Sequence, residues 1–283
     1  RFLLTGSSAR KLRRSTANLL AGRARIAHLF PLTFSEIPNF NLKKYLLLGG
    51  LPEANLAEDP IDFLNSYIET YLKEEIMAEQ VARNLPHFSR FLKVAALSNG
   101  ELINYAKLAS DSQLPESTVK NYFEALNDTL VGHTLEPWTE SKKRKSIQTG
   151  KFYFFDLGVR NRILDLETIP EETDLFGRVF EHFIFMELQA YKSYNKINKP
   201  LMFWRSTSQH EVDFVLGALA IEVKSKKKIT HRDAKNLFVL KEEKQHKNFI
   251  VVSQDKIDHS KDDIHYYHWK TFLKKLWNKE FFV

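Results

Sequence analysis

The second half of the chain alternates between helical and strand-like spacing of its apolar residues. From 174 to 191 the apolar positions recur at helical intervals, as in Phe176, Val179, Phe180 and Phe183, and predict a long buried helix. Three predicted strands follow it, at 201–205, 211–216 and 220–223. A helix is then predicted at 231–240, strands at 248–253 and 264–267, and a final helix at 268–277. This order of elements indicates an α/β domain.

The first half of the chain is mostly helical in pattern. A short strand is predicted at 1–5, and after it a helix that ends at Gly22. Asp59 and Pro60 predict the start of a long helix that reaches about residue 81, because proline is favoured at the first helical position. Three helices are predicted at 87–98, 101–110 and 115–127. Two strands follow at 130–138 and 151–155, with a polar loop between them.

Residues 87–155 have the element order of a winged helix, in which one helix positions a recognition helix and a hairpin forms the wing. The recognition helix would begin near Pro115, and its polar N-terminal residues are Ser117, Thr118, Lys120 and Asn121. The predicted wing tip carries basic side chains suited to phosphate contacts, namely Lys142, Lys143, Arg144 and Lys145. Winged helices also bind proteins, and a charged loop is often exposed to solvent without binding any partner. The sequence therefore leaves both DNA and a protein as possible partners.

Composition narrows the function classes. Among the 283 residues, 42 Lys and Arg against 35 Asp and Glu give a net charge of +7, which permits a nucleic-acid partner without requiring one. The chain has no cysteine, which excludes disulfide scaffolds, thiolate zinc sites and cysteine nucleophiles. No apolar run approaches the roughly 20 residues that span a bilayer, and no signal peptide is visible, so we expect a cytoplasmic protein without membrane contact.

The most informative stretch carries two acids and a lysine within apolar strands. Asp213 lies inside the predicted strand 211–216. Glu222 and Lys224 stand two residues apart on the next strand, so both face the same side of the sheet. Antiparallel pairing would place Asp213 beside them. Two carboxylates that meet across a sheet form an oxygen site suited to Mg²⁺ or Mn²⁺. A nearby ammonium can orient a water nucleophile and neutralise phosphate charge.

An Asp followed by Glu-x-Lys in apolar surroundings resembles the PD-(D/E)xK motif of the restriction-endonuclease-like nucleases. In that superfamily an upstream helix often supplies another acid, and Glu181 matches that position. The resemblance implies Asp213 and Glu222 as metal ligands, Lys224 as the catalytic lysine and Glu181 as a supporting acid. The alternative is an inactive descendant of the fold, in which the same charges form a buried ion-pair cluster.

Further short motifs follow one another in order along most of the chain. They lie at 2–8, 20–23, 30–36, 45–53, 152–158, 177–187, 211–216 and 221–224. Their order resembles a family of prokaryotic AAA+-type ATPases with a winged helix and a C-terminal domain of unknown function that has a restriction-endonuclease-like core. In that family the first four segments correspond to the sensor-1 strand, the end of the ATPase core and the lid.

The resemblance implies an α/β multidomain chain of three consecutive parts. They are the end of an AAA+ core with its lid, a helical linker with the winged helix, and a restriction-endonuclease-like domain, at 1–56, 57–155 and 156–283. Thr5 or Ser7 would face the γ-phosphate and its water, and Arg23 would reach a phosphate in the same or a neighbouring subunit. ATP and Mg²⁺ would be cofactors of the parent protein. No G-x-x-x-x-G-K-[ST] loop occurs in the chain, so we expect that it neither binds nor hydrolyses ATP.

We interpret the chain as the C-terminal portion of an ATP-dependent molecular switch whose C-terminal domains bind nucleic acid or a protein partner. It opens on strand-like residues without a Met, which indicates that it belongs to a longer protein. The alternatives are a metal-dependent nuclease and a non-catalytic interaction module on the same fold. The oligomeric state stays open.

Overall fold

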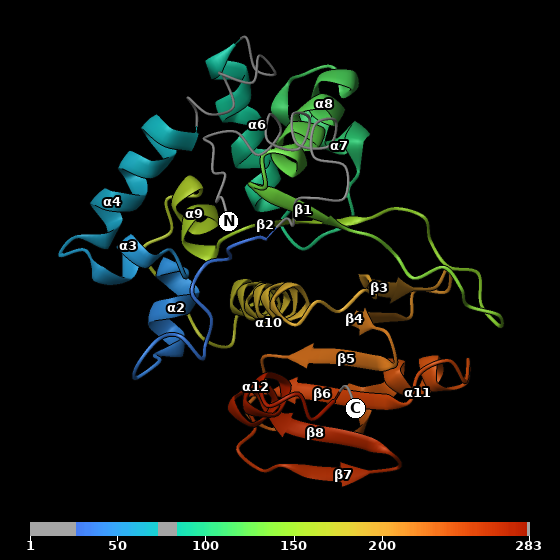
Figure 1. Ribbon diagram of the computed structural model, residues 1–283. Coiled ribbons are helices and arrows are strands. Elements are labelled where there is room, and N and C mark those ends of the chain that lie inside the picture. Colours follow the sequence, from blue (N-terminus) through green and yellow to red (C-terminus); the bar gives the residue numbers. More distant parts are fainter. Residues whose placement is uncertain (1–26, 73–83, 282–283) are drawn as a thin grey trace, which may run out of the picture. The chain divides into compact units, whose positions relative to one another are not determined.

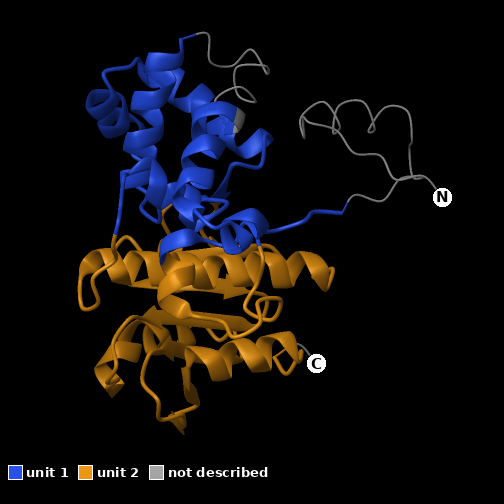
Figure 2. Ribbon diagram, turned by 90° about the vertical axis from the view of Figure 1, so that its left-hand side faces the viewer, with its two compact units in different colours: residues 1–31, 47–134, 152–167 blue, residues 32–46, 135–151, 168–283 orange. Residues whose placement is uncertain are grey.

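The computed structural model describes residues 27–72 and 84–281. The strand predicted at 1–5, the helix after it, and Thr5, Ser7 and Arg23 lie outside these residues. The chain forms two compact units that alternate along the sequence (Figure 2). The helical unit comprises residues 47–134 and 152–167 with 27–31, and the α/β unit comprises residues 32–46, 135–151 and 168–283. The division into three consecutive domains at 56 and 155 stays a prediction.

The predicted helix that starts at Pro60 is present as far as the chain is described. The carboxylate of Asp59 accepts hydrogen bonds from the N–H groups of Ile61 and Asp62, both at 3.0 Å, and so caps α4 (Pro60–Ser66). The helix continues in the wider π form as η1 (Tyr67–Leu72). The other elements up to residue 167 are α2 (Leu42–Leu48), α3 (Pro52–Leu56), α6 (Leu85–Leu97), α7 (Tyr105–Ser112), α8 (Glu116–Asp128), β1 (Gly132–Leu135), β2 (Lys151–Phe154) and α9 (Leu157–Ile163) (Figure 1).

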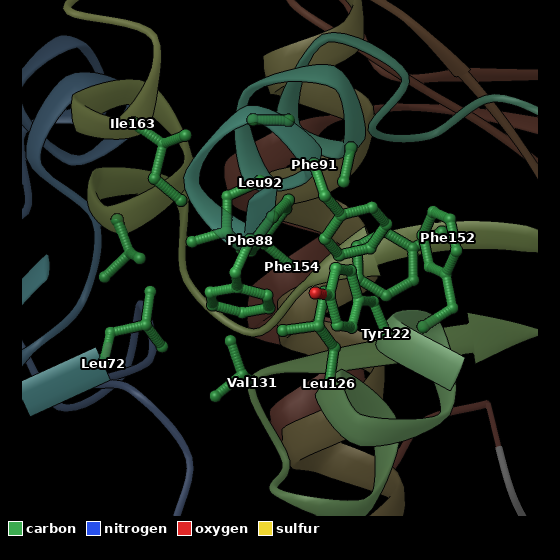
Figure 3. Packing of buried hydrophobic residues seen from close by; sticks show 14 of the residues in the cluster. Leu72, Phe88, Phe91, Leu92, Tyr122, Leu126, Val131, Phe152, Phe154 and Ile163 are labelled. Atoms are coloured by element: carbon green, nitrogen blue, oxygen red, sulfur yellow. The ribbon is translucent and has the colours of Figure 1, made fainter. Parts of the chain in front are cut away.

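Aromatic side chains from α6, α8 and β2 form the centre of the helical unit (Figure 3). Phe88 and Phe91 lie one turn apart on α6, and their ring centroids are 5.3 and 5.1 Å from that of Tyr122 on α8. The ring of Phe152 lies 4.8 Å from that of Phe123. All five side chains are buried, so the helices predicted at 87–98 and 115–127 are confirmed by the packing of their apolar faces.

Two helix starts in this unit follow side-chain caps rather than the apolar pattern. α7 begins at Tyr105 instead of the predicted 101, because the Asn104 side chain accepts a hydrogen bond from the N–H of Lys107 at 3.0 Å. The apolar pattern does not predict α9. There the Asp156 carboxylate accepts a hydrogen bond from the N–H of Val159 at 3.0 Å and supplies the cap.

The α/β unit contains a six-stranded mixed sheet with the strand order β3-β4-β5-β6-β8-β7 (Figure 1). β3 (Leu201–Arg205), β4 (Glu211–Leu216) and β5 (Leu219–Lys224) pair antiparallel, which for β4 and β5 is the pairing considered from the sequence. β5, β6 (Asn248–Ser253) and β8 (Ile264–His268) pair parallel. The exposed edge strand β7 (His259–Lys261) has no apolar pattern, and the sequence does not predict it.

Helices α10 (Asp174–Tyr194), α11 (Lys235–Lys241) and α12 (Trp269–Trp277) complete the α/β unit, with a short 3-10 helix, η2 (His231–Ala234), before α11. Glu187 of α10 is buried. It accepts hydrogen bonds from the N–H of Phe34 at 2.6 Å and from Trp277 Nε1 at 2.8 Å, and so ties α10 to residues 32–46 and to α12. Burial raises its pKa to about 7. Of the helices in the described ranges, none has the length and apolar character to cross a membrane.

The Gly49–Gly50 turn packs closely on the start of α9 within the helical unit. The N–H of Gly50 donates a hydrogen bond of 2.7 Å to the buried Asp156 carboxylate. Gly49 has a φ of +73°, and a Cβ there would lie 2.3 Å from Asp156 Oδ1. A Cβ on Gly158 would lie 2.0 Å from the backbone oxygen of Leu48. Neither position has room for a side chain.

Replacing Gly158 tests this close approach. Gly158→Ala is expected to lower the free energy of unfolding by about 2–3 kcal/mol, because the new methyl group would meet a backbone carbonyl that cannot rotate away. Urea unfolding followed by circular dichroism measures the change. Gly177→Ala is the control. It lies inside α10, its added methyl group would have Ser225 Oγ as nearest neighbour at 3.5 Å, and stability should hold or rise by about 0.5–1 kcal/mol. Equal stability of both variants would contradict the packing described here.

Candidate functional site

Asp213 and Glu222 lie on adjacent strands of the α/β unit, just beyond the point where their backbone ladder ends. The register of β4 and β5 runs from the Leu216–Leu219 pair to the Phe214–Ile221 pair. Beyond it, Asp213 Oδ2 accepts a hydrogen bond of 2.7 Å from the N–H of Val223. The Asp213 side chain therefore takes over a backbone donor of β5.

Lys224 reaches inward from the end of β5 to a buried acid. Its Nζ donates a hydrogen bond of 2.5 Å to Glu222 Oε1, while 31% of the lysine side chain stays exposed. Glu222 itself is 2% exposed, and its second oxygen, Oε2, is buried without a hydrogen-bond partner among the described residues. An unsatisfied buried carboxylate oxygen is unusual in a native structure and calls for a partner.

A second lysine joins the cluster, and the sequence does not single it out. Lys151 is only 4% exposed, and its Nζ lies 2.5 Å from a carboxylate oxygen of Glu211 and 3.3 Å from one of Glu181. Arg205 Nη1 contacts the other oxygen of Glu211 at 2.9 Å. Glu211 stands two residues before Asp213, so strand alternation could have placed both acids on one face. The sequence gives a weaker indication for Lys151, because it shows only a lysine at the start of an apolar strand.

The electrostatics of the cluster favour retained protons on its buried acids. Burial raises the pKa of Glu222 to about 7, although Lys224 lowers it. Burial, then the charges of Glu222 and Glu181, raise the pKa of Asp213 well above its usual range. Burial lowers the pKa of Lys224, but the carboxylates of Glu222 and Asp213 outweigh this, so its pKa lies above the ordinary value. Lys224 therefore stays protonated at neutral pH.

The donor set fits a hard divalent cation with few protein ligands. Asp213 and Glu222 offer carboxylate oxygens, which suit Mg²⁺ or Mn²⁺, and Glu222 Oε2 has no other partner in the described part of the chain. No group of three or more His, Cys, Asp or Glu side chains within residues 27–72 and 84–281 is arranged to hold a metal ion. Further ligands would therefore be backbone carbonyls or water, as is common for Mg²⁺.

The candidate nucleic-acid residues of the predicted recognition helix lie on the first half of α8. Ser117, Lys120 and Asn121 are exposed and Thr118 is half-buried. Lys120 pairs with Glu116 at 2.7 Å, so its charge is partly matched within the same helix. A role of these residues in nucleic-acid binding stays a prediction.

The basic loop predicted as a wing tip is held by other residues of the α/β unit. The N–H groups of Lys142 and Lys143 donate hydrogen bonds of 2.8 and 2.9 Å to Glu243. Arg144 Nη2 pairs with Glu242 at 2.8 Å. The loop is therefore not a freely projecting tip, although its three lysine side chains are exposed. Phosphate contact by these lysines stays a prediction.

Comparison with known families finds two matches along the chain. Residues 39–169 match a family model described as a domain of unknown function (DUF8612), and residues 176–272 match another domain of unknown function (DUF4143). No solved structure shows a significant match. These matches do not specify an activity.

Several curated proteins resemble the chain over most of its length. An uncharacterized protein of Mycobacterium tuberculosis is 28% identical over 218 residues, which cover 75% of this chain and 48% of the relative. An uncharacterized protein of Methanocaldococcus jannaschii is 24% identical over 242 residues, 76% of this chain and 52% of the relative. One from Haemophilus influenzae is 20% identical, over 66% of this chain and 50% of the relative. The chain thus spans about half the length of the curated relatives it matches.

Removing the buried ammonium of Lys151 tests how the acids are held together. Lys151→Met is expected to lower the free energy of unfolding by about 2–3 kcal/mol at pH 7, because Glu181 and Glu211 lose their shared cation. Burial raises the pKa of Glu211, but Lys151 and Arg205 outweigh this and hold it below its ordinary 4.5. The stabilisation that the ionised Glu211 contributes is therefore present above about pH 4.5 and is lost as the pH falls through its lower, folded-state pKa. The difference in free energy of unfolding between wild type and Lys151→Met should accordingly shrink toward pH 4.

Urea unfolding at pH 7 and pH 4 measures both effects. Lys151→Arg keeps the charge and should lose less stability than Lys151→Met. Lys107→Met, at an exposed position of α7, should change stability at neither pH. If Lys151→Met lost the same free energy at both pH values, packing rather than charge would account for the effect.

Proposed function

We propose that the α/β unit is a divalent-cation-dependent, nuclease-type site for phosphodiesters. The observation that carries the proposal is the pair of buried carboxylates, Asp213 and Glu222, since Glu222 Oε2 has no hydrogen-bond partner within residues 27–72 and 84–281. Burial and mutual repulsion oppose the ionisation of both acids, and a hard cation that accepts oxygens from both would stabilise their ionised forms. The resemblance of Asp213, Glu222 and Lys224 to the PD-(D/E)xK motif supports the same function.

In this proposal each side chain has a separate role. Asp213 and Glu222 hold Mg²⁺ or Mn²⁺, which supplies Lewis-acid polarisation of a phosphoryl oxygen when bound. Lys224 keeps its proton at neutral pH, so it acts as a fixed positive charge toward the phosphate and the attacking water rather than as a general base. Glu181 supports the site through its contact with Lys151.

A non-catalytic interaction module is the second candidate function, and one observation favours it. The two lysines of the cluster already contact acids, Lys224 at Glu222 and Lys151 at Glu181 and Glu211. Such a cluster can be stable as an internal ion-pair network without any metal ion. The two candidates differ in whether Mg²⁺ or Mn²⁺ binds.

We also propose that the chain is the C-terminal portion of a longer, ATP-dependent switch protein with ATP and Mg²⁺ as cofactors. Two observations support this. The chain spans about half of its curated relatives, and domains of the type matched at 176–272 are often found with AAA-type ATPase domains. The partner of this longer protein would be nucleic acid or another protein, bound through the helical and α/β units.

Metal titration tests the nuclease-type proposal. Wild-type protein should bind Mn²⁺ in the millimolar range or more tightly by isothermal titration calorimetry, and Asp213→Asn should weaken binding at least about tenfold because a charged ligand is lost. Cleavage of a supercoiled plasmid with Mg²⁺ or Mn²⁺ should disappear in Lys224→Met while Mn²⁺ binding remains. The matched control is Asp165→Asn, whose carboxylate is exposed and belongs to the helical unit.

Other outcomes of the metal titration and the cleavage assay would contradict the nuclease-type site or favour another function. No binding of either ion at millimolar concentration would refute the nuclease-type site. Mn²⁺ binding without cleavage of any nucleic acid would favour the interaction module. Equal weakening in Asp213→Asn and Asp165→Asn would show that the bound ion lies elsewhere.

The proposal of a longer ATP-dependent protein has its own test. The chain alone should show no saturable binding of a fluorescent ATP analogue at millimolar concentration, because it has no G-x-x-x-x-G-K-[ST] loop. A longer gene product that contains the chain should bind ATP with Mg²⁺ and should encode that loop upstream of Arg1. A gene without such a loop would contradict the proposal.

A further inference from the structure

A lysine-lined hollow of about 780 Å³ lies on the α/β unit, away from the carboxylate cluster. Its polar lining includes Lys241 at the end of α11, Lys244 and Lys247 in the segment that leads into β6, and residues of β7 and β8, namely Ser260, Lys261 and His265. We call this feature the basic hollow. Its positive charges come from segments on both sides of the hollow, so a bound anion would be approached from more than one direction.

The charge of the basic hollow is not balanced by its own acids. Asp263 contacts Lys241 at 2.9 Å, and Asp262 contacts His231 at 3.0 Å, so these two carboxylates already have partners. Lys244, Lys247 and Lys261 are exposed, and none of them forms an ion pair with any residue that the structure describes. The lining therefore carries four lysines against two aspartates, an excess of two positive charges with its histidines neutral.

Backbone and ring contacts fix the floor of the basic hollow. The N–H of Lys247 donates a hydrogen bond of 2.9 Å to the backbone oxygen of Ala218. The ring of His246 hydrogen-bonds the backbone oxygen of Gly217 at 3.0 Å and packs edge-on against Trp138, with the ring centroids 4.8 Å apart. The lysines thus project from a segment that is anchored to the sheet rather than from a free tail.

The basic hollow and the carboxylate cluster lie at opposite ends of β5. The hollow is next to Ala218, just before the strand starts, whereas Glu222 and Lys224 lie at its other end. At about 3.3 Å per residue, the length of β5 separates the two features by roughly 15 Å. The inference below therefore does not depend on the proposed nuclease-type site.

We infer that the basic hollow binds the phosphate backbone of a nucleic-acid duplex. Lysines act as point charges that neutralise phosphates without reading sequence. The described lining has no exposed Phe, Tyr or Trp ring, since its Phe249 is buried, so base stacking by a single strand lacks a large aromatic platform. The edge strand β7 is only three residues long and ends in Lys261, which offers an acidic peptide little backbone to pair with.

Fluorescence anisotropy with a labelled duplex of about 20 base pairs tests the inference on the whole chain. Replacing Lys244, Lys247 and Lys261 together by alanine should weaken binding at least about tenfold at low salt. The slope of log affinity against log salt should fall by about two to three, since each lost phosphate contact contributes about 0.9. The matched control removes three exposed lysines elsewhere, Lys44, Lys107 and Lys274, and should keep nearly wild-type binding. Thermal unfolding confirms that both variants are folded.

Four results would overturn the inference. Absence of duplex binding by the wild-type chain at about 50 mM salt would remove its basis. Equal weakening by both triple variants would show a general charge effect rather than a site. Binding of a poly-glutamate peptide as tight as that of the duplex, and lost only in the hollow variant, would assign the hollow to an acidic protein. The same variant leaves α8 and the loop at 142–145 intact, so unchanged duplex binding would also overturn the inference in favour of those surfaces.

Discussion

The buried ammonium group of Lys151 is the contact on which the charged interior of the α/β unit depends. It lies between Glu181 of α10 and Glu211 of β4, two acids that come from different elements and would otherwise repel each other out of water. Burial raises the pKa of Asp213, and the charges of Glu222 and Glu181 raise it further. Burial also raises the pKa of Glu222, with Glu211 and Glu181 adding to the effect. Lys151 thus allows α10 and β4 to bring several acids close together. The proposed metal binding requires this clustering of carboxylates.

The sheet gives this cluster its position. Where the β4–β5 ladder ends, the Asp213 side chain replaces a backbone acceptor by taking the N–H of Val223, and the acids collect at that end. The carboxyl ends of parallel strands are the usual place for ligand sites in α/β sheets, and β5 also pairs parallel with β6. The other end of β5 carries the opposite charge in the basic hollow. A single strand therefore separates the proposed cation site from the proposed anion-binding surface.

Sequence patterns predict the regular parts of this molecule well because those parts bury one clear apolar face. The strand at 201–205 and the strand at 211–216 have the predicted bounds, and α10 extends only three residues beyond its predicted end at 191. The start of α7 depends on the Asn104 cap, and β7 forms only because β8 offers an edge, so neither follows from periodicity. In the site, the spacing of Asp213, Glu222 and Lys224 predicts their proximity. Lys151 joins them only through the tertiary fold.

The alternation of the two units along the chain limits how the α/β unit can be inherited or rearranged. A gene segment for residues 156–283 would omit Lys151, which neutralises Glu211, and Trp138, which belongs to the buried core of that unit. It would also omit Phe34, whose N–H binds the buried carboxylate of Glu187. A cut of the gene anywhere between residues 46 and 168 would separate segments of the α/β unit. A transfer that keeps this unit intact would therefore carry the helical unit with it.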